Sequence, residues 1–127
     1  MSVFHNHQEV VETYQYLLSK AEREDSCRCI VIGQSNRYVD VKYTIPCSGR
    51  HVRTKAHQVA LLLRLGTTSP PTDTEASHLC NKKNCVSARH LSAEPHSINM
   101  DRSMCFRERD VRGPGFCHGH GSYPNCI

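Results

Sequence analysis

Cysteine and histidine residues in the segment 77–105 are spaced as the ligands of one metal ion. The segment reads SHLCNKKNCVSARHLSAEPHSINMDRSMC, and Cys80, Cys85 and His90 are separated by four residues each. Thiolate and imidazole groups are common ligands of Zn²⁺, and four protein ligands nearly always close a structural zinc site. We therefore predict a structural zinc ion held by these three residues and by one ligand from another segment.

The fourth ligand is expected among the cysteines of the N-terminal half. Cys29 is the first choice, because it lies at the start of the apolar stretch 28–32 (RCIVI) and would tie this strand to the metal-binding segment. Cys27 has the same strand parity as Cys29 and is an alternative. Cys47 is the third candidate.

Four further residues near the C-terminus form a second candidate zinc site. Cys105, Cys117, His120 and Cys126 enclose a glycine-rich loop with few apolar residues, which needs another source of stability. His118 is an alternative to His120, but the glycine before His120 gives its backbone more freedom to turn toward an ion. We favour His120 as the ligand.

Two residues of the same half, His78 and Asn99, are not explained by zinc. A short strand to His78, a metal-bound loop, a strand at 90–92 and a helix entered through Pro95 would form a strand–strand–helix unit. Proline suits the first turn of such a helix. Asn99 would then lie on the second helical turn and face the strand that carries His78.

The side chains of His78 and Asn99 suit phosphodiester hydrolysis. A neutral imidazole accepts a proton from an attacking water molecule, while a divalent ion stabilises charge on the phosphate and the leaving 3′ oxygen. Magnesium prefers oxygen ligands and keeps several waters, so one Asn carbonyl and phosphate oxygens can hold it. Each residue alone also has a plain structural interpretation, as a core or capping histidine and as a surface helix residue.

The residues of this half resemble the His-Cys box of homing endonucleases, which belong to the ββα-metal (His-Me finger) nucleases. The resemblance covers about residues 29–126 and is strong across 77–126. The matching positions are Ser77-His78-Leu79-Cys80, Cys85, His90-Leu91, Asn99, Arg102, Cys105, Cys117-His118-Gly119-His120 and Cys126.

The resemblance implies a metal-dependent endonuclease, a hydrolase that cuts DNA. It implies that His78 is the general base and that Asn99 binds one catalytic Mg²⁺. It also implies two structural zinc ions, one held by Cys29, Cys80, Cys85 and His90 and the other by Cys105, Cys117, His120 and Cys126.

An arginine near the scissile phosphate is also implied by the resemblance. The family pattern places it near Arg50 after a shift of one residue, and Arg53 is a credible substitute. Arg102 is close enough to Asn99 on the predicted helix to reach a phosphate as well.

The elements that must position these residues give an α+β fold, a small zinc-stapled domain. We expect an N-terminal amphipathic helix, an antiparallel hairpin, a second helix closed by Gly66 and the ββα-metal motif. Their predicted ranges are 8–22 for the first helix, 28–32 and 39–45 for the hairpin, 51–53 for a short strand and 55–65 for the second helix. A Ser/Thr/Pro linker follows at 67–73.

We expect residues 1–127 to form a single domain with three parts. Residues 1–26 hold the N-terminal helix, residues 27–66 the hairpin and second helix, and residues 77–126 the zinc-bound ββα-metal nuclease core. With 38% hydrophobic residues and no Trp, the apolar core must be thin, and small domains commonly add metals when the core is insufficient.

Charge and composition favour DNA as the partner. The net charge is +4, and no acidic residue lies between 41 and 72, as expected of a surface that follows phosphates. The basic residues of this stretch are Lys42, Arg50, Arg53, Lys55 and Arg64. We expect double-stranded DNA as the substrate and no membrane contact. A homodimer is compatible with the resemblance, but the C-terminal tail exchanged by known dimeric members has no counterpart here.

Eight Cys and nine His residues also bear on the compartment. The N-terminus has no basic region followed by a continuous apolar stretch, so we expect an intracellular protein, nuclear or cytoplasmic, with zinc rather than disulfides. Two alternatives remain to the nuclease: a secreted disulfide-stapled protein, and a catalytically inactive zinc-stabilised nucleic-acid-binding or regulatory module.

Overall fold

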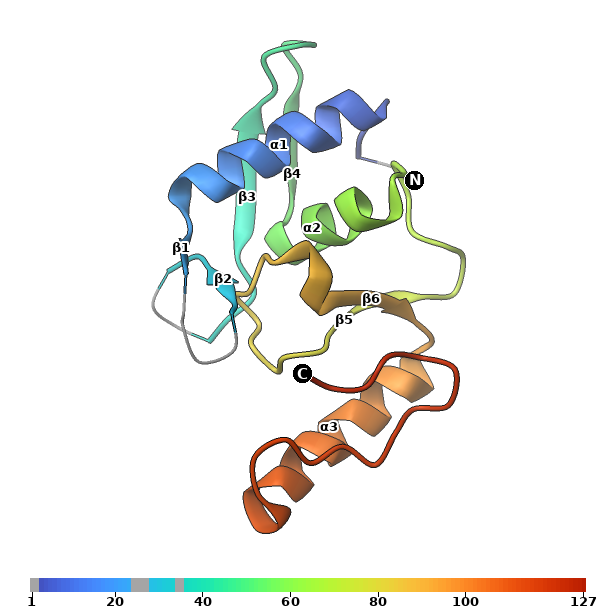
Figure 1. Cartoon of the computed structure of the whole chain (residues 1–127). Coiled ribbons are helices and arrows are strands. Elements are labelled where there is room, and N and C mark those ends of the chain that lie inside the picture. The colour runs from blue at the N-terminus through green and yellow to red at the C-terminus, as the bar shows by residue number, and fades with distance from the viewer. Residues whose placement is uncertain (1–2, 24–27, 34–35) are drawn as a thin grey trace.

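The computed structural model describes residues 3–23, 28–33 and 36–127 and has the predicted α+β fold (Figure 1). None of the described helices is long and apolar enough to cross a membrane. The elements in chain order are α1 (His7–Lys20), β1 (Glu22–Arg23), β2 (Ile30–Val31), β3 (Asp40–Thr44), β4 (His51–Lys55), α2 (Ala56–Leu65), β5 (Glu75–His78), the 3₁₀ turn η1 (Ala88–His90), β6 (Leu91–Glu94) and α3 (His96–Arg112).

Both N-terminal helices agree with the sequence prediction to within two residues. Helix α1 begins after Asn6, whose side chain accepts a hydrogen bond of 3.0 Å from the backbone N–H of Glu9. This is the usual role of an N-cap residue, because it satisfies a free N–H of the first turn. Helix α2 ends before Gly66, which has a left-handed φ of 69°, the conformation that favours glycine at a helix C-terminus.

The predicted hairpin was wrong in its pairing. Strand β3 pairs antiparallel with β4, whereas the stretch 28–32 pairs with β1 and with the metal-binding loop. Val86 donates its N–H to the Ile30 carbonyl (2.7 Å), and Ile32 donates to the Asn84 carbonyl (3.1 Å). Residues 45–50 join β3 and β4 in a short loop, and this local connection leaves 28–32 free to pair with a distant loop.

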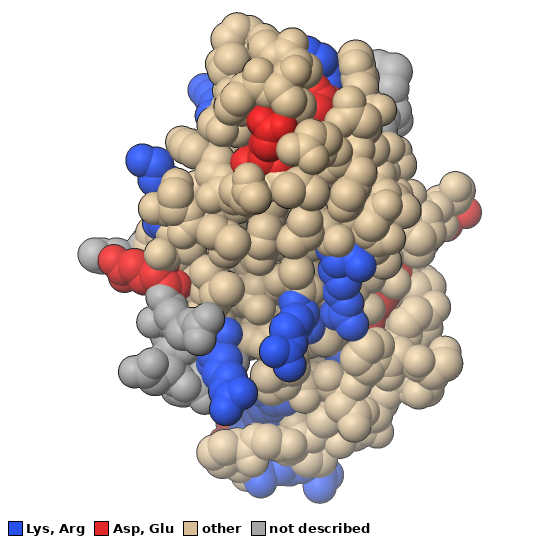
Figure 2. All heavy atoms as spheres, turned by 45° about the horizontal axis from the view of Figure 1, so that its top comes forward, with Lys and Arg blue, Asp and Glu red and all other residues tan. Residues whose placement is uncertain are grey.

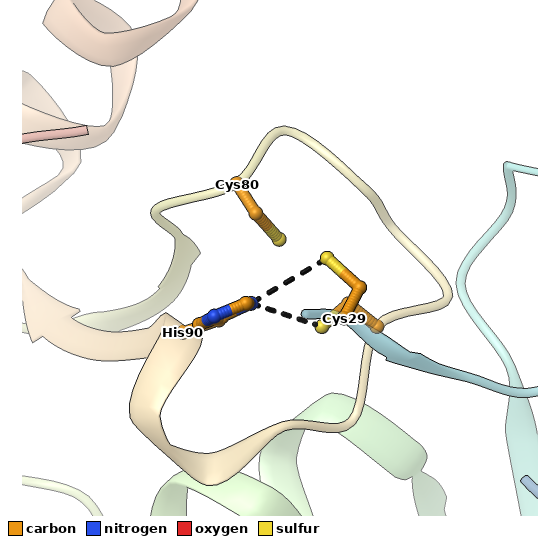
Figure 3. A group of neighbouring side chains, drawn as sticks. Cys29, Cys80 and His90 are labelled. Carbon is orange, nitrogen blue, oxygen red and sulfur yellow. Dashed lines mark hydrogen bonds between the residues drawn. The ribbon is translucent and has the colours of Figure 1, made fainter. Parts of the chain in front are cut away.

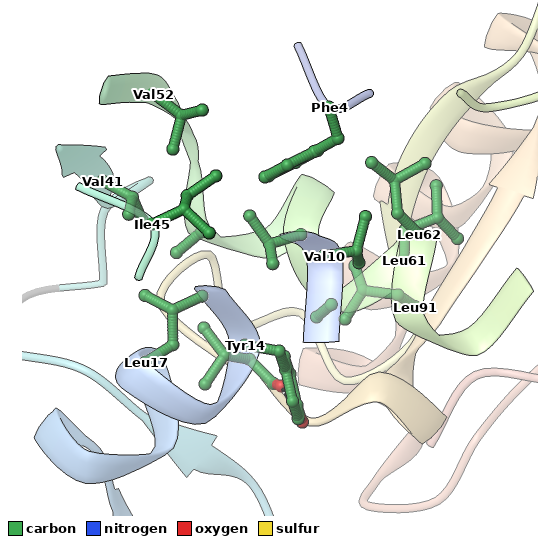
Figure 4. Packing of buried hydrophobic residues seen from close by; sticks show 14 residues of the cluster. Phe4, Val10, Tyr14, Leu17, Val41, Ile45, Val52, Leu61, Leu62 and Leu91 are labelled. Atoms are coloured by element: carbon green, nitrogen blue, oxygen red, sulfur yellow. Dashed lines mark hydrogen bonds between the residues drawn. The ribbon is translucent and has the colours of Figure 1, made fainter. Parts of the chain in front are cut away.

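One apolar core joins α1, the β3–β4 hairpin, α2 and the start of β6. Its side chains converge beneath α1 (Figure 4). Tyr14 also donates its hydroxyl to the Val86 carbonyl (2.8 Å), which ties α1 to the metal-binding loop. The buried members of the core are Phe4, Val10, Tyr14, Leu17, Val41, Ile45, Val52, Ala56, Val59, Ala60, Leu61, Leu62, Val86 and Leu91.

Strands β5 and β6 and helix α3 form the predicted strand–strand–helix unit. The two strands are antiparallel, with His78 opposite Leu91, and the loop between them carries the first group of metal ligands. Pro95 is the N-cap of α3, one position earlier than expected. The chain after α3 runs back along this helix (Figure 1), and Ile127 donates its N–H to the Leu79 carbonyl (2.7 Å).

Candidate active site and metal sites

The first predicted ligand set comes together between β2 and the β5–β6 loop. Cys29, Cys80, Cys85 and His90 are all buried, and their ligand atoms lie within 4.8 Å of one another. Sulfur ligands about 2.3 Å from a tetrahedral zinc ion lie roughly 3.8 Å apart, so this spacing fits one zinc. The Nδ1 atom of His90 is 3.5 Å from the sulfurs of Cys29 and Cys85 (Figure 3).

Two thiols of this site, those of Cys80 and Cys85, are coupled by a hydrogen bond. The Cys80 thiol donates to Cys85 and lowers the pKa of Cys85 to about 5, and the same contact raises the pKa of Cys80. Zinc binds the thiolate rather than the thiol, so part of the required deprotonation is favourable before an ion arrives. Of the two alternatives for the fourth ligand, Cys47 is exposed and donates its backbone N–H to the Glu12 carboxylate at 3.0 Å. Cys27 lies outside the described residues.

The second predicted ligand set joins α3 to the C-terminal tail. The ligand atoms of Cys105, Cys117, His120 and Cys126 also lie within 4.8 Å of one another. Burial raises the pKa of the Cys117 thiol, but the backbone N–H groups of Cys126 and Gly119 outweigh burial and bring this pKa down to about 6. Both groups of four therefore fit a structural zinc ion.

The structure places His120, not His118, in the second ligand set. The Nε2 atom of His120 faces the Cys126 sulfur at 3.1 Å, and its Nδ1 atom lies 2.8 Å from the Asp101 carboxylate. A carboxylate behind a zinc-bound imidazole fixes the ring orientation and raises its basicity. His118 binds the same Asp101 oxygen at 3.0 Å, which raises the pKa of His118.

His78 and Asn99 line one cavity of about 90 Å³, beside the first ligand set. This volume has room for several water molecules. Strand β5 brings His78 to it, and the first turns of α3 bring Asn99. The other residues that line the cavity are Tyr38, Ala76, Asn81, Lys83, Ser103 and Phe106.

The ring of His78 is held by the backbone of the first ligand set. Its Nε2 atom lies 3.0 Å from the carbonyl oxygen of Cys85. A carbonyl only accepts, so Nε2 must carry the proton in the neutral ring, and Nδ1 keeps the basic lone pair. Burial lowers the pKa of His78 below its ordinary 6.5, which favours the neutral form.

The side chain of Asn99 is oriented by Glu75 at the start of β5. The Asn99 Nδ2 atom donates to Glu75 Oε1 at 2.6 Å. Because the hydrogen bond uses the amide nitrogen, the amide oxygen Oδ1 stays available as a ligand for a hard cation. His96 Nδ1 lies 3.0 Å from the same Glu75 oxygen.

Two aromatic rings beside His78 had no signal in the sequence. The ring centroid of His57 lies 5.1 Å from that of His78 and 4.7 Å from that of Tyr38. Burial lowers the pKa of His57 to about 4, and its Nδ1 atom has no hydrogen-bond partner among the described residues. His57 is therefore a neutral ring packed against the candidate base.

Arg50, the arginine first expected near a phosphate, makes structural contacts in this conformation. Arg50 forms an ion pair of 2.6 Å with the buried Glu9 and donates to the Val3 carbonyl at 2.9 Å, at the end of the β3–β4 hairpin. Contact with a phosphate would require Arg50 to leave this ion pair. Arg53, the second candidate for the phosphate contact, is exposed on β4 opposite Lys42.

Arg102 does not face a phosphate either. It is 1% exposed and donates two hydrogen bonds, of 2.7 and 2.5 Å, to the carboxylate of the buried Glu94. It also donates to the Pro124 carbonyl at 2.7 Å. The expectation that Arg102 could reach DNA was wrong, because its helical position turns it toward β6 and the tail.

The strand–strand–helix unit and its two Cys/His groups define a zinc-stapled domain of the His-Me finger type. Residues 32–127 match the family described as the zinc-binding loop region of homing endonuclease. This match covers most of the chain, and the chain belongs to that family. None of the curated proteins and none of the solved structures compared with the chain matches it.

Sequence spacing located the metal ligands but missed the groups that orient them. Asp101, Glu75 and the Cys85 carbonyl each act on a ligand or candidate catalytic residue from a distant position. A weak signal existed for Asp101, which lies on the predicted helix four residues before Cys105 and so on the same helical face. No comparable signal marked Glu75 or the aromatic residues.

Proposed function

We propose that this protein is a magnesium-dependent endonuclease that cuts double-stranded DNA and leaves 5′-phosphate and 3′-hydroxyl ends. The observation that carries the proposal is the shared cavity of His78 and Asn99, with one nitrogen of His78 held by the Cys85 carbonyl. The two zinc-fitting groups support the loop and helix that carry these residues. The family match supports DNA as the substrate.

The donor set in the cavity fits one magnesium ion. Asn99 Oδ1 is a hard oxygen, and the Glu75 carboxylate, bound to the nitrogen end of the same amide, adds negative charge from outside the cavity. Magnesium needs few protein ligands, because it keeps several waters and takes phosphate oxygens. When bound, the ion would supply positive charge for the phosphate and the leaving oxygen.

His78 acts as the general base in this proposal. With Nε2 held by the Cys85 carbonyl, Nδ1 accepts a proton from a water molecule in the cavity. Burial of the His78 ring lowers its pKa and so disfavours a charged imidazole. Since a general base works only in the neutral form, we expect cleavage to rise with pH through a pKa below 6.5 and then level off.

Positive side chains near the cavity and on the hairpin suit the DNA backbone. Lys83 lines the cavity, and its Nζ atom lies 5.4 Å from the centroid of the Tyr38 ring. Lys42 and Arg53 are exposed on the hairpin. Lys and Arg side chains gather over the lower part of the face seen in Figure 2, with fewer acidic residues among them. We assign the phosphate contacts to Lys83, Lys42 and Arg53 rather than to Arg50.

We also infer that the N-terminal helix, the hairpin and the ββα unit act as one domain. The apolar core contains residues from α1, β3, β4, α2 and β6, so none of these elements has a core of its own. Helix α3 contributes no residue to this core and is joined to β6 by the ion pair of Arg102 with Glu94. The candidate base on β5 would thus depend on packing from the N-terminal half.

The experiment that tests the proposal is cleavage of supercoiled plasmid by zinc-loaded protein with and without Mg²⁺. Omission of Mg²⁺ is preferable to EDTA, since a chelator would also remove structural zinc. Wild-type protein should nick or linearise the plasmid only with Mg²⁺. His78→Ala and Asn99→Ala should lose at least about 100-fold in rate while keeping zinc content and DNA binding.

His5→Ala is the matched control for the histidine change, because His5 is exposed and lies just before the start of α1. It should cleave as the wild type does. Intact plasmid together with a normal mobility shift on DNA would favour the inactive binding module instead. Retained cleavage by His78→Ala would remove this residue from the role of base.

A further inference from the structure

The carboxylate of Glu75 links the start of β5 to the first turns of α3. Its Oε1 atom accepts from Asn99 Nδ2 at 2.6 Å and lies 3.0 Å from His96 Nδ1. Glu75 does not line the cavity that His78 and Asn99 share. Its contact with Asn99 is therefore made from outside the candidate active site.

This contact determines which end of the Asn99 amide is free. The oxygen and nitrogen of an Asn amide are nearly equal in size, so packing alone does not choose between them. The hydrogen bond from Asn99 lowers the pKa of Glu75, which keeps the carboxylate ionised near neutral pH. An ionised carboxylate only accepts hydrogen bonds, so only the NH₂ group of Asn99 can face it.

A purely structural role for Glu75 predicts a different pattern of contacts. An anion that only stabilises a helix N-terminus binds the free backbone N–H groups of the first turn. Helix α3 has no side-chain cap from its N-cap residue Pro95, yet the hydrogen bonds of Glu75 go to the side chains of His96 and Asn99. The carboxylate is thus aimed at the candidate metal ligand.

We propose that Glu75 is a positioning residue of the cation site, which holds the Asn99 amide with Oδ1 free for the ion and adds one negative charge beside it. This inference rests on the proposed function, because the ion is the magnesium of the nuclease reaction. A group behind a metal ligand commonly changes metal affinity by about 10- to 100-fold.

The test compares Glu75→Ala and Glu75→Gln with the wild type in two measurements. The first is the Mg²⁺ concentration that gives half-maximal plasmid cleavage. Glu75→Ala should raise this concentration about 10-fold and recover most of the maximal rate at saturating Mg²⁺. Glu75→Gln should lie between the two, since its amide oxygen still accepts from Asn99 but carries no charge.

The second measurement is the NMR signal of the Asn99 side-chain NH₂ group in zinc-loaded protein without Mg²⁺. The signal is assigned by its absence from Asn99→Ala. In the wild type it should show the downfield shift of a group bound to a carboxylate, and in Glu75→Ala it should move toward the position of a solvated amide. Glu108→Gln is the matched control, because Glu108 lies on α3 and pairs with Arg112 at the surface.

Three outcomes would overturn the inference. An unchanged Mg²⁺ response in Glu75→Ala, with or without a lower thermal stability, would leave Glu75 a structural role only. Loss of cleavage at every Mg²⁺ concentration, as in Asn99→Ala, would make Glu75 a direct ligand. An Asn99 NH₂ signal that is the same in both proteins would show that Glu75 does not orient the amide.

The failure of the proposed function would look different from these outcomes. A wild-type protein that never cleaves with Mg²⁺ would remove the nuclease proposal and, with it, the catalytic meaning of Glu75. The NMR comparison would still report on the hydrogen bond in that case. An Asn99 NH₂ signal that differs between wild type and Glu75→Ala would then show that the hydrogen bond exists and that the nuclease proposal alone is wrong.

Discussion

The part of the chain up to β6 and the segment after β6 are stabilised by different forces. The apolar core draws its buried residues from positions 4–91, and its partly buried neighbours extend to Ala93. In α3 and the tail, the buried residues are Arg102, Cys105 and His120, which contribute an ion pair and metal ligands. Figure 1 shows this segment set beside the rest of the molecule, with the tail lying along α3.

The two zinc-fitting groups therefore stabilise different parts of the molecule. The first group lies where β2 and the β5–β6 loop meet the apolar core, so it holds these two segments against the core. The second group takes the place of a core in a segment with exposed apolar side chains, such as Met104 and Val111. Loss of the first should disturb the whole domain, and loss of the second should disturb the segment alone.

The largest expected effect comes from Cys85→Ser compared with Cys117→Ser. Structural zinc supplies roughly 10–16 kcal/mol of apparent binding energy in small domains, more than the whole stability of most domains. Cys85→Ser should therefore prevent stable folding. Cys117→Ser should keep the amide signals of α1, α2 and the hairpin in an NMR spectrum and lose those of the tail, with half the zinc content of the wild type. Equal unfolding of both variants would mean that the segment and the core form one cooperative unit.

A smaller effect is expected from Arg102→Ala, which removes one partner of a buried ion pair. Glu94 is 0% exposed and would be left as an unpaired buried charge. Breaking such a pair costs about 3–5 kcal/mol, to be measured as the free energy of unfolding in urea. Arg112→Ala is the control, because its pair with Glu108 is exposed and contributes about 0.2–1 kcal/mol. A similar loss in both variants would show that the Arg102 pair is not the link between β6 and the tail.

The smallest expected effect concerns Glu9, which joins α1 to the β3–β4 turn. Burial raises the pKa of its carboxyl, but hydrogen bonds from Ser48, the His5 N–H and Arg50 outweigh burial and lower this pKa from 4.5 to about 2. The unfolded chain therefore takes up the proton at higher pH than the folded chain does. The stabilisation from Glu9 is complete above the unfolded pKa and is lost as the pH falls toward the folded pKa.

Glu9→Gln provides the measurement of this effect. The difference in free energy of unfolding between wild type and variant should be the same at about pH 7 and pH 6 and smaller at about pH 4. Zinc content must be checked at each pH, because acid also protonates the metal ligands. A difference that grows toward acid pH would contradict the assigned direction of the pKa shift.

The local elements and most of the metal ligands could be predicted from the amino-acid sequence. Hydrophobic periodicity and a glycine cap located α1 and α2, and Pro95 marked the start of α3 to within one residue. The spacing of Cys and His indicated Cys80, Cys85 and His90 and the C-terminal set, and Cys29 was the first of three candidates because of its place at the start of the stretch 28–32. These features depend on residues that are close in the chain, or on the requirement that a structural zinc ion has four protein ligands.

Contacts between groups that are distant in the chain could not be predicted in this way and follow from the folded structure. It paired β3 with β4 instead of 28–32, because the latter is bound by the metal-binding loop. It placed Arg50 on Glu9 and Arg102 on Glu94, whereas the sequence shows only basic side chains that suit a phosphate equally well. Strand register and helix rotation set such contacts, and in this chain they placed Glu75 behind Asn99 and the Cys85 carbonyl behind His78.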